Sequence, residues 1–461
     1  MRATVRPLMA AVFVLFVAGC QRDVLSPPSS NDANSDPELI SQGIIATAGW
    51  SATAPIFDVD PVEASRPLQA WGREHVVGDV AHYWFSVRVG FGTYDIIRIH
   101  RVVREERPFQ PIRTGLNLFL LHGDYKDFEG CFLPGTRYPR VPESYGFATF
   151  LAQNGVDVWG IDQAWTLVPE TAPDLSFMAD WGLPRQVRDL RTAITVAAVT
   201  RKLMGNPSRK VHLCGYSSGS TVGFALLDQE SQLPPGRRIV DGFIGVDQGV
   251  VTDVSSWEES MCGVVESYQA LIDSGQFQDY NPLPFFGLPA RDDPNGMSEI
   301  PGFEGLTNLQ AGLALGAYPF FPPDTGHFLS AVLDEDELPI GLLYTTVDWW
   351  VDFMVDSPPY EPCAFLRDEY ITSCPAAGDV PWDDHLGDIR NPVLYVSAGG
   401  GFGYTGAYTL DLLGSPDVSE LLVSVTTDPF FDVAHVDLFL ANDTPALFWQ
   451  PVLEWVDEHS R

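Results

Sequence analysis

Apolar and polar positions along the chain define two kinds of segment. Short runs that are apolar nearly throughout, typical of strands buried on both faces, alternate with longer stretches of helical periodicity. The predicted strands are residues 116–121, 156–161, 211–214, 239–246, 393–396 and 421–425, and the predicted helices are residues 145–153, 185–204, 221–228 and 445–458. This alternation predicts an α/β fold, in which a mostly parallel sheet is covered by helices on both faces.

Two regions depart from the alternation. Residues 83–104 alternate β-branched and aromatic side chains around Gly90-Phe91-Gly92, which predicts a hairpin. Between the strands at 239–246 and 393–396 lie far more residues than one strand–helix–strand step needs. We therefore predict a core in two parts, 41–247 and 388–461. An aromatic- and proline-rich cap subdomain, 248–387, is inserted at the sheet edge where ligands bind.

The first twenty residues have the pattern of a signal peptide. Arg2 and Arg6 precede an unbroken apolar run, residues 8–19, which is too short to span a bilayer. The run ends in Val-Ala-Gly before Cys20, which resembles the bacterial lipobox, where the cysteine takes the lipid. The resemblance implies a lipoprotein that is held by a flexible tether, residues 21–40, at the outer membrane or cell surface. An ordinary cleaved signal with an accidental cysteine is the alternative.

Composition excludes several classes of function. Apolar residues make up 45% of the chain, so it is not disordered as a whole. A formal net charge of −34 repels phosphate backbones, which excludes nucleic acid as a partner. The acidic clusters at 292–296 and 334–337 lack the spacing of a calcium loop, and the sequence has no phosphate-binding loop. We therefore expect no metal and no cofactor.

The cysteines that follow the signal are compatible with a disulfide outside the cytoplasm. Cys363 and Cys374 lie in one proline-rich segment, so a local bridge between them is the predicted pairing. Cys131 with Cys262 is a second possibility, and Cys214 reads as a small apolar residue inside a strand.

The segment Gly215-Tyr216-Ser217-Ser218-Gly219 matches the pattern G-x-S-x-G between a predicted strand and a predicted helix. A sharp turn there requires small residues two positions before and after the serine. It lifts the Ser217 hydroxyl clear of the sheet, at a helix N-terminus that favours developing negative charge. This context predicts a nucleophile elbow.

With this motif, the sequence resembles the α/β-hydrolase family over residues 80–250 and 388–461. The family carries a His-Gly turn after its third strand, and His122-Gly123 matches it. The resemblance implies an oxyanion hole that is formed by the backbone N–H of Ser218 and that of Asp124, or of Tyr125 in its place.

The family's triad runs in the order nucleophile, acid, histidine. His435 follows the last predicted strand, within residues 431–439, and resembles the family's catalytic histidine. The usual place for the acid, after strand 393–396, holds a glycine run without a carboxylate. Some lipase-like members carry the acid one strand earlier, where this chain has Asp247, so Asp247 is the predicted acid. The alternatives are Asp384, Asp411 and Asp432.

Together these features predict a serine hydrolase that cleaves small carboxylic esters through an acyl-enzyme, with an apolar acyl or alcohol group under the cap. The same site would serve an aminopeptidase-like peptidase or an acyltransferase. A hydrolase scaffold retained as a catalytically dead binding lipoprotein is the alternative from another class. The sequence gives no indication of the oligomeric state.

Overall fold

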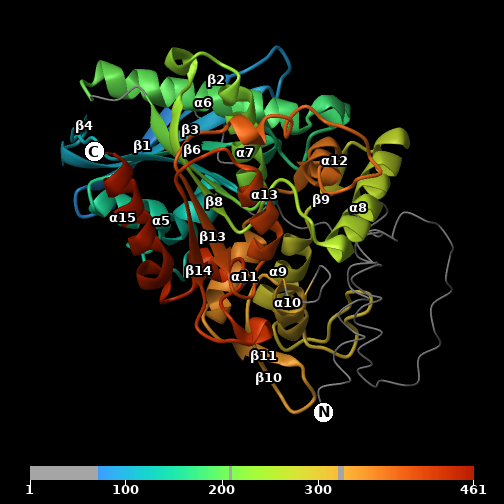
Figure 1. Ribbon diagram of the computed structural model, residues 1–461. Coiled ribbons are helices and arrows are strands. Elements are labelled where there is room, and N and C mark those ends of the chain that lie inside the picture. The colour runs from blue at the N-terminus through green and yellow to red at the C-terminus, as the bar shows by residue number, and fades with distance from the viewer. Residues whose placement is uncertain (1–70, 207–209, 320–325, 461) are drawn as a thin grey trace.

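The computed structural model describes residues 71–206, 210–319 and 326–460 (Figure 1). The predicted signal peptide, with Cys20, and the predicted tether lie outside the described residues. Among the described residues, no helix has the length and apolar character that crossing a membrane requires.

A central sheet has the strand order β1-β2-β3-β6-β5-β7-β8-β13-β14, and a short strand, β4, pairs with β3. The strands from β6 to β14 pair in parallel, whereas β1, β2 and β3 are antiparallel to their neighbours. Their bounds are β1 Trp71–Val77, β2 Val80–Arg88, β3 Ile96–Arg107, β4 Gln110–Pro111, β5 Asn117–Leu121, β6 Asp157–Asp162, β7 Val211–Tyr216, β8 Val240–Val246, β13 Val393–Ala398 and β14 Val418–Val423. The mostly parallel sheet confirms the predicted fold class.

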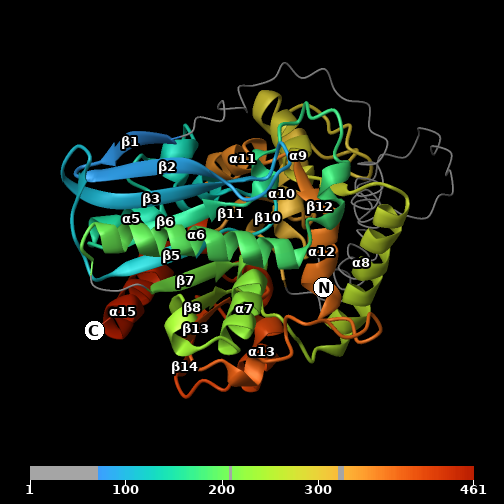
Figure 2. The same ribbon diagram turned by 90° about the horizontal axis from the view of Figure 1, so that it is seen from above.

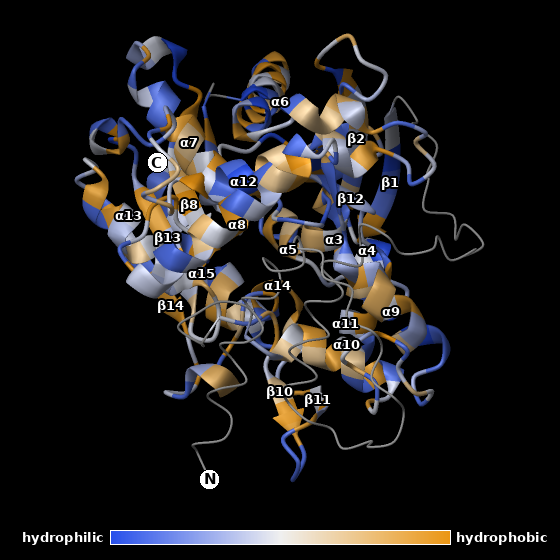
Figure 3. Ribbon diagram, turned by 90° about the vertical axis from the view of Figure 1, so that its right-hand side faces the viewer, coloured by the Kyte–Doolittle hydropathy of each residue, from blue (hydrophilic) through white to orange (hydrophobic). Residues whose placement is uncertain are grey.

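Helices cover both faces of the sheet. On one face lie α6 (Leu183–Leu203), α7 (Ser218–Ser231) and α13 (Ala407–Leu412); on the other lie α3 (Phe128–Phe132), α5 (Phe147–Gln153) and α15 (Gln450–His459). Each face has its own apolar core, and the central strands β8 and β13 are strongly hydrophobic (Figure 3). Burial on both faces explains why these strands read as continuous apolar runs.

The elements between β8 and β13 gather beyond one end of the strands, as the positions of α8, α9 and α12 in Figure 2 show. They are α8 Ser255–Asp273, β9 Gln278–Tyr280, α9 Pro282–Asp292, α10 Asn308–Ala317, β10 Ala331–Leu333, β11 Pro339–Leu342, α11 Val347–Val355, β12 Tyr360–Pro362 and α12 Cys363–Ile371. Most of their aromatic side chains, Trp350 and Phe286 among them, form a separate core. The carboxyl ends of the parallel strands face this insertion.

Short elements complete the chain. These are α4 Pro134–Arg137, α14 Asp437–Leu440, a π-helical turn at Pro445–Trp449, and the 3-10 turns Ala164–Leu167, Ser176–Asp180, Pro235–Arg237, Leu386–Asp388, Gly403–Gly406 and Pro429–Phe431. The hairpin predicted around residues 90–92 is present, since β2 and β3 pair antiparallel on either side of it. The edge strand β1 was not predicted from the sequence pattern.

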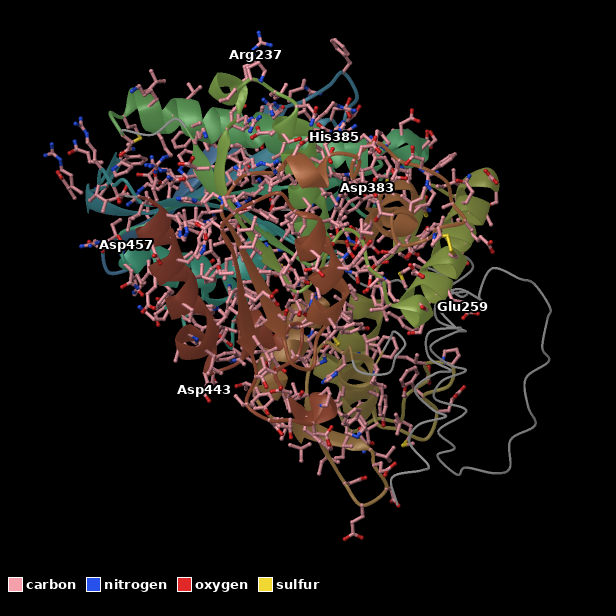
Figure 4. All side chains as sticks on the ribbon, viewed as in Figure 1. Arg237, Glu259, Asp383, His385, Asp443 and Asp457 are labelled. Carbon is pink, nitrogen blue, oxygen red and sulfur yellow. A yellow bond between two sulfur atoms is a disulfide. The ribbon has the colours of Figure 1, made fainter. Side chains whose placement is uncertain are left out.

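The disulfide differs from the predicted pairing. Cys374 is bonded to Cys262, with the two Cα atoms 4.7 Å apart, and not to Cys363 (the yellow bond beside α8 in Figure 4). Cys363 is the first residue of α12, and this nine-residue helix separates it from Cys374. At 1.5 Å per residue the helix spans about 14 Å, well beyond disulfide reach. The alternative pairing of Cys131 with Cys262 is excluded too, and Cys131 and Cys214 are both buried.

Candidate active site

Ser217 occupies a sharp turn between β7 and α7. Its backbone angles are φ 57° and ψ −129°, a conformation that side-chain-bearing residues rarely adopt. A Cβ on Gly215 would lie 2.2 Å from the carbonyl oxygen of Gly219, and one on Gly219 would lie 2.6 Å from the carbonyl oxygen of His122. The glycines on both sides of the serine are therefore required by contact, and the turn has the geometry predicted for a nucleophile elbow.

His435 and Asp247 are brought together from segments that are 188 positions apart in the sequence. His435 Nδ1 lies 2.7 Å from Asp247 Oδ2, and the two side chains are almost fully buried. Asp247 follows directly after β8 and has a positive φ of 61°, whereas His435 lies in the loop between β14 and α14. A carboxylate on Nδ1 fixes the imidazole orientation and leaves Nε2 for proton transfer.

The glycine-rich loop after β13 encloses the Asp247 carboxylate. Ala398 N–H donates to Asp247 Oδ1 at 2.8 Å, and Phe402 N–H donates to Oδ2 at 3.0 Å. A Cβ on Gly401 would lie 2.1 Å from Asp247 Oδ2. Because β8 and β13 are hydrogen-bonded neighbours, the loop at the usual place for the acid serves an acid from the adjacent strand. Nothing in the sequence predicted this role, because the glycine run itself carries no carboxylate.

Aromatic rings surround the imidazole of His435. Tyr216 stacks on it with ring centres 4.6 Å apart, and the Phe402 ring centre lies at 4.8 Å. Phe328, from the insertion, lies at 6.0 Å, and its backbone carbonyl accepts a hydrogen bond from the nearby Val436 N–H. These contacts give the histidine an apolar setting, which restricts water near the reacting atoms.

The hydroxyl of Ser217 contacts a residue that sequence reasoning missed. Ser217 Oγ donates to Gln248 Oε1 at 3.4 Å, and Gln248 Nε2 donates to Thr221 Oγ1 at 3.2 Å and to the carboxylate of Glu369. Gln248 directly follows Asp247, so its position after a strand was visible in the sequence. An amide side chain carried no signal of chemistry by itself.

Two backbone N–H groups were predicted for the oxyanion hole. Ser218 begins α7 directly after the nucleophile, and the turn after β5 approaches it closely, since a Cβ on Gly123 would lie 2.6 Å from the Cβ of Ser217. The Tyr125 N–H donates to Glu361 Oε2 at 2.9 Å. With the Tyr125 N–H engaged, Asp124 is the better of the two choices for the second donor.

The other carboxylates considered for the triad have different partners. Asp432 accepts hydrogen bonds from the backbone N–H groups of Val425 and Val433 and from the Ser424 hydroxyl, which holds the loop after β14. Asp384 and Asp411 are exposed. Only Asp247, of these four, contacts His435 within hydrogen-bond distance in the described structure.

One group of described residues places three potential metal ligands together: His82, His100 and Glu129. His82 Nε2 lies 2.9 Å from His100 Nδ1, and the two ring planes differ by 14°. The two nitrogens are thus at the distance of an N–H···N hydrogen bond, and the two rings are nearly parallel. The outer nitrogens contact Glu74 and Asp162, so the histidines form a buried hydrogen-bonded chain across the sheet.

A cavity of about 580 Å³ lies apart from this site. It is lined by residues of the β2–β3 loop and the start of α6, with Trp181 and Arg185 among them, and neither Ser217 nor His435 lines it. The volume of a cavity alone therefore does not identify the catalytic site in this protein.

The sequence matches no protein-family model, and the search of curated proteins returned no match. The fold is similar to that of a candidate lipase from Sulfolobus solfataricus (TM-score 0.57, 15% identity, covering 82% of this chain and 95% of that one). A hypothetical protein from Pseudomonas aeruginosa (0.46, 11%, 84% and 96%) and a soluble variant of monoglyceride lipase from Saccharomyces cerevisiae (0.45, 10%, 87% and 99%) also match. These identities show the fold alone. The chain has the α/β-hydrolase fold, as the resemblance implied.

Proposed function

We propose that this protein is a serine hydrolase that cleaves carboxylic esters through an acyl-enzyme. The observation that carries the proposal is the contact between His435 Nδ1 and Asp247 Oδ2, on the same sheet edge as Ser217 in its strained turn. A buried carboxylate–imidazole pair beside a serine lifted at a helix N-terminus matches the requirements of nucleophilic catalysis.

The reaction follows from the roles of these groups. Ser217 Oγ attacks the ester carbonyl carbon while His435 Nε2 takes the hydroxyl proton, and Asp247 stabilises the imidazolium that forms. The backbone N–H groups of Ser218 and Asp124 stabilise the tetrahedral oxyanion. His435 then gives its proton to the leaving alcohol, and water hydrolyses the acyl-enzyme by the same steps. The apolar rings of Phe328 and Phe402 favour an apolar substrate group beside the histidine.

The test is hydrolysis of p-nitrophenyl esters from acetyl to palmitoyl by the wild type and by Ser217→Ala. We expect turnover by the wild type and its loss in the variant. Ser220→Ala is the matched control, because Ser220 lies in the same helix and its buried hydroxyl has no hydrogen-bond partner among the described residues. Equal rates in the wild type and Ser217→Ala, or no turnover of any ester, would contradict the proposal.

We also propose that Cys20 carries acyl chains that hold the enzyme at the cell envelope, with its catalytic domain outside the cytoplasm. The support is the apolar run that ends in Val-Ala-Gly-Cys. Metabolic labelling with radioactive palmitate in a bacterial host should label the wild type and not Cys20→Ser. Equal labelling of both would contradict the anchor without affecting the proposed reaction.

A further inference from the structure

The turn after β5, which carries the second predicted oxyanion donor, is held by two different parts of the fold. On the side of the core, His122 Nδ1 lies 2.9 Å from the carbonyl oxygen of Gly123, and its Nε2 accepts a hydrogen bond from the Gln163 N–H at 3.3 Å. The Asp124 N–H comes next in the chain and donates to none of the described residues. From Tyr125 onward the contacts are with the insertion. The proposed donor therefore lies at the boundary between the two parts.

Tyr125 is bound to the insertion through three of its groups. Its N–H donates to Glu361 Oε2 at 2.9 Å, and its hydroxyl donates to Asp279 Oδ2 at 2.6 Å. Its carbonyl oxygen accepts from Asn281 Nδ2 at 3.3 Å. Tyr125 also has a positive φ of 55°, which a residue with a side chain keeps only where its surroundings enforce it. The insertion thus fixes the backbone of the residue directly after the donor.

Lys126 makes the next connection to the insertion. Its side chain is buried, and Nζ donates to the carbonyl oxygens of Phe353 and Asp356, each at 2.9 Å, and to Ser357 Oγ at 3.0 Å. An ammonium group has three N–H bonds, so each of them has an acceptor. The centre of the Phe353 ring lies 4.0 Å from Nζ, and its π-face attracts the cation as well.

The acceptors of Lys126 lie at the carbonyl end of α11. Phe353 belongs to the last turn of this helix, and Asp356 is its C-cap. The last carbonyl groups of a helix lack partners within it and carry partial negative charge, which favours a cation. Burial opposes the charge and lowers the pKa of Lys126 to about 8. A buried cation is costly unless it is hydrogen-bonded, and here the bonds to α11 compensate that cost.

The opposite side of the turn contacts the nucleophile elbow. A Cβ on Gly123 would lie 2.6 Å from the Cβ of Ser217, so no side chain fits between the turn and the elbow. The turn is thus confined between Ser217 and the insertion. An oxyanion donor has to lie about 2.7–3.1 Å from the oxygen that becomes charged, so a small displacement of the turn weakens its effect.

We propose that Lys126 is a positioning residue for ester hydrolysis: its ammonium group, bound to the carbonyl end of α11, holds the turn that presents the Asp124 N–H to the oxyanion. This inference rests on the proposed function and deepens it, because it makes the insertion part of the frame of the oxyanion hole. Lys126 acts through the backbone of the turn, which connects it to the donor two residues earlier.

The test is the variant Lys126→Met, which keeps an unbranched side chain but removes the three donors. We expect kcat for a p-nitrophenyl ester to fall about ten- to a hundredfold, with KM changed by less than about twofold, because the oxyanion forms only in the transition state.

Two inhibitors give a readout that a purely structural role would not move. Ser217 Oγ adds to the carbonyl carbon of a trifluoromethyl ketone and leaves a tetrahedral oxyanion, so this ketone should bind Lys126→Met more weakly by about the same factor as the loss of kcat. The methyl ketone with the same chain, which binds without addition, should bind the variant and the wild type equally.

Arg140→Met is the matched control. Arg140 also binds α11, through Asp348 at 2.7 Å and Asp352 at 2.6 Å, but it lies outside the turn after β5. We expect both variants to have a lower Tm and only Lys126→Met to have a lower kcat. An equal loss of kcat in the two variants, or wild-type kcat in a folded Lys126→Met, overturns the positioning role.

Tyr125→Phe is the second variant, for the case that Lys126→Met does not fold. It removes only the hydroxyl that donates to Asp279, and the Tyr268 hydroxyl still donates to that carboxylate at 3.1 Å. We expect kcat to fall about threefold or more with KM unchanged, because the turn loses one of its bonds to the insertion. Wild-type kcat in Tyr125→Phe would then overturn the inference.

A fluorophosphonate probe separates this inference from the proposed function. If the wild type is labelled on Ser217 but the variants show none of the expected losses, only the positioning role fails. If the folded wild type is not labelled, the proposed function fails, and the positioning role fails with it.

Discussion

At the scale of single residues, the site depends on backbone conformations that side chains rarely adopt. Ser217 and Asp247 both have φ near +60°, and each costs about 1–3 kcal/mol unless its surroundings enforce it. The close contacts at Gly215 and Gly219 enforce the backbone conformation of Ser217. The N–H groups of Ala398 and Phe402 hold the carboxylate of Asp247. Strain retained at both a serine and a carboxylate indicates that their placement has a function.

Asp247→Asn should reduce kcat for ester hydrolysis roughly a thousandfold or more, because the amide no longer fixes the imidazole tautomer or stabilises the imidazolium. Steady-state kinetics with a p-nitrophenyl ester measures the loss, and circular dichroism checks folding. Asp411→Asn, at an exposed alternative carboxylate, is the matched control and should keep wild-type kcat. A large loss of kcat in Asp411→Asn, together with wild-type kcat in Asp247→Asn, would show that Asp247 is not the acid of the triad.

At the scale of elements, the loop after β13 and the end of β8 act as one unit. The residues that surround the acid come from one strand, and the acid comes from its neighbour in the sheet. The insertion contributes in the same way, because Phe328 and Glu369 reach the site from beyond the strand ends. The site is thus assembled where several elements end.

Gly401→Ala should reduce activity sharply, since the added methyl group would lie 2.1 Å from Asp247 Oδ2 and displace the carboxylate from His435. Gly341→Ala, in β11, provides the control because the nearest atom to its added methyl group is 3.8 Å away. Ester hydrolysis of the two variants at equal folded concentration measures the difference. Full activity in Gly401→Ala would show that the loop does not position the acid.

The disulfide between α8 and the segment after α12 closes a loop of 112 residues within the insertion. Replacing both cysteines by serine should lower the free energy of unfolding by about 4–5 kcal/mol, from the greater freedom of the unfolded chain. Denaturant unfolding measures the change. Peptide mapping without reduction should recover Cys262 joined to Cys374. A peptide that joins Cys363 to Cys374 would contradict this disulfide and support the local pairing predicted from the sequence.

The elements were predictable where burial leaves a pattern in the sequence, as in β5, β7 and β8, which are apolar nearly throughout. The glycines around Ser217 made the elbow visible for the same reason, since contact requires them. The partner of Cys374 was not predictable, because it depends on how α8 packs against α12. Gln248 and the carboxyls of Glu361 and Glu369 were missed because only the fold brings these polar residues together.

At the scale of the whole molecule, charge is distributed unevenly between surface and interior. The formal net charge is −34, and charged side chains such as Arg237, Glu259 and Asp443 lie at the outer boundary in Figure 4. Inside, burial raises the pKa of Asp437 to about 7 and that of Asp189 to about 6, and partial burial raises the pKa of Asp383 to about 6. Both features predict that the folded state is more stable in mildly acidic solution, where the surface carboxylates repel one another less and these carboxyls stay protonated.

The Tm should therefore fall as the pH rises from about 4 to 7. Carboxyls with a raised pKa ionise first in the unfolded chain, near pH 4, so folding loses stability until they ionise in the folded chain as well. Asp162 acts in the opposite sense: burial alone would raise its pKa, but His100 and Arg98 lower it, so its contribution is lost only in stronger acid. Scanning calorimetry at pH 5 and pH 8 measures the difference.

Salt provides the control for this prediction. Concentrated NaCl screens repulsion between surface charges, whereas buried carboxyls are screened much less. We expect the difference in Tm to shrink in 1 M NaCl, a concentration at which the Debye length is about 3 Å, but not to vanish. A Tm that increases from pH 5 to pH 8 would contradict the assignment of raised pKa values to the interior.

The activation of Ser217 is the central claim, and covalent labelling tests it most directly. A fluorophosphonate probe, followed by peptide mass spectrometry, should give one adduct, on Ser217, at neutral pH. His435→Ala should abolish the adduct while the fold persists, because the hydroxyl then has no base to take its proton. A folded wild-type protein without an adduct on Ser217, or equal labelling of the His435→Ala variant, would contradict the account.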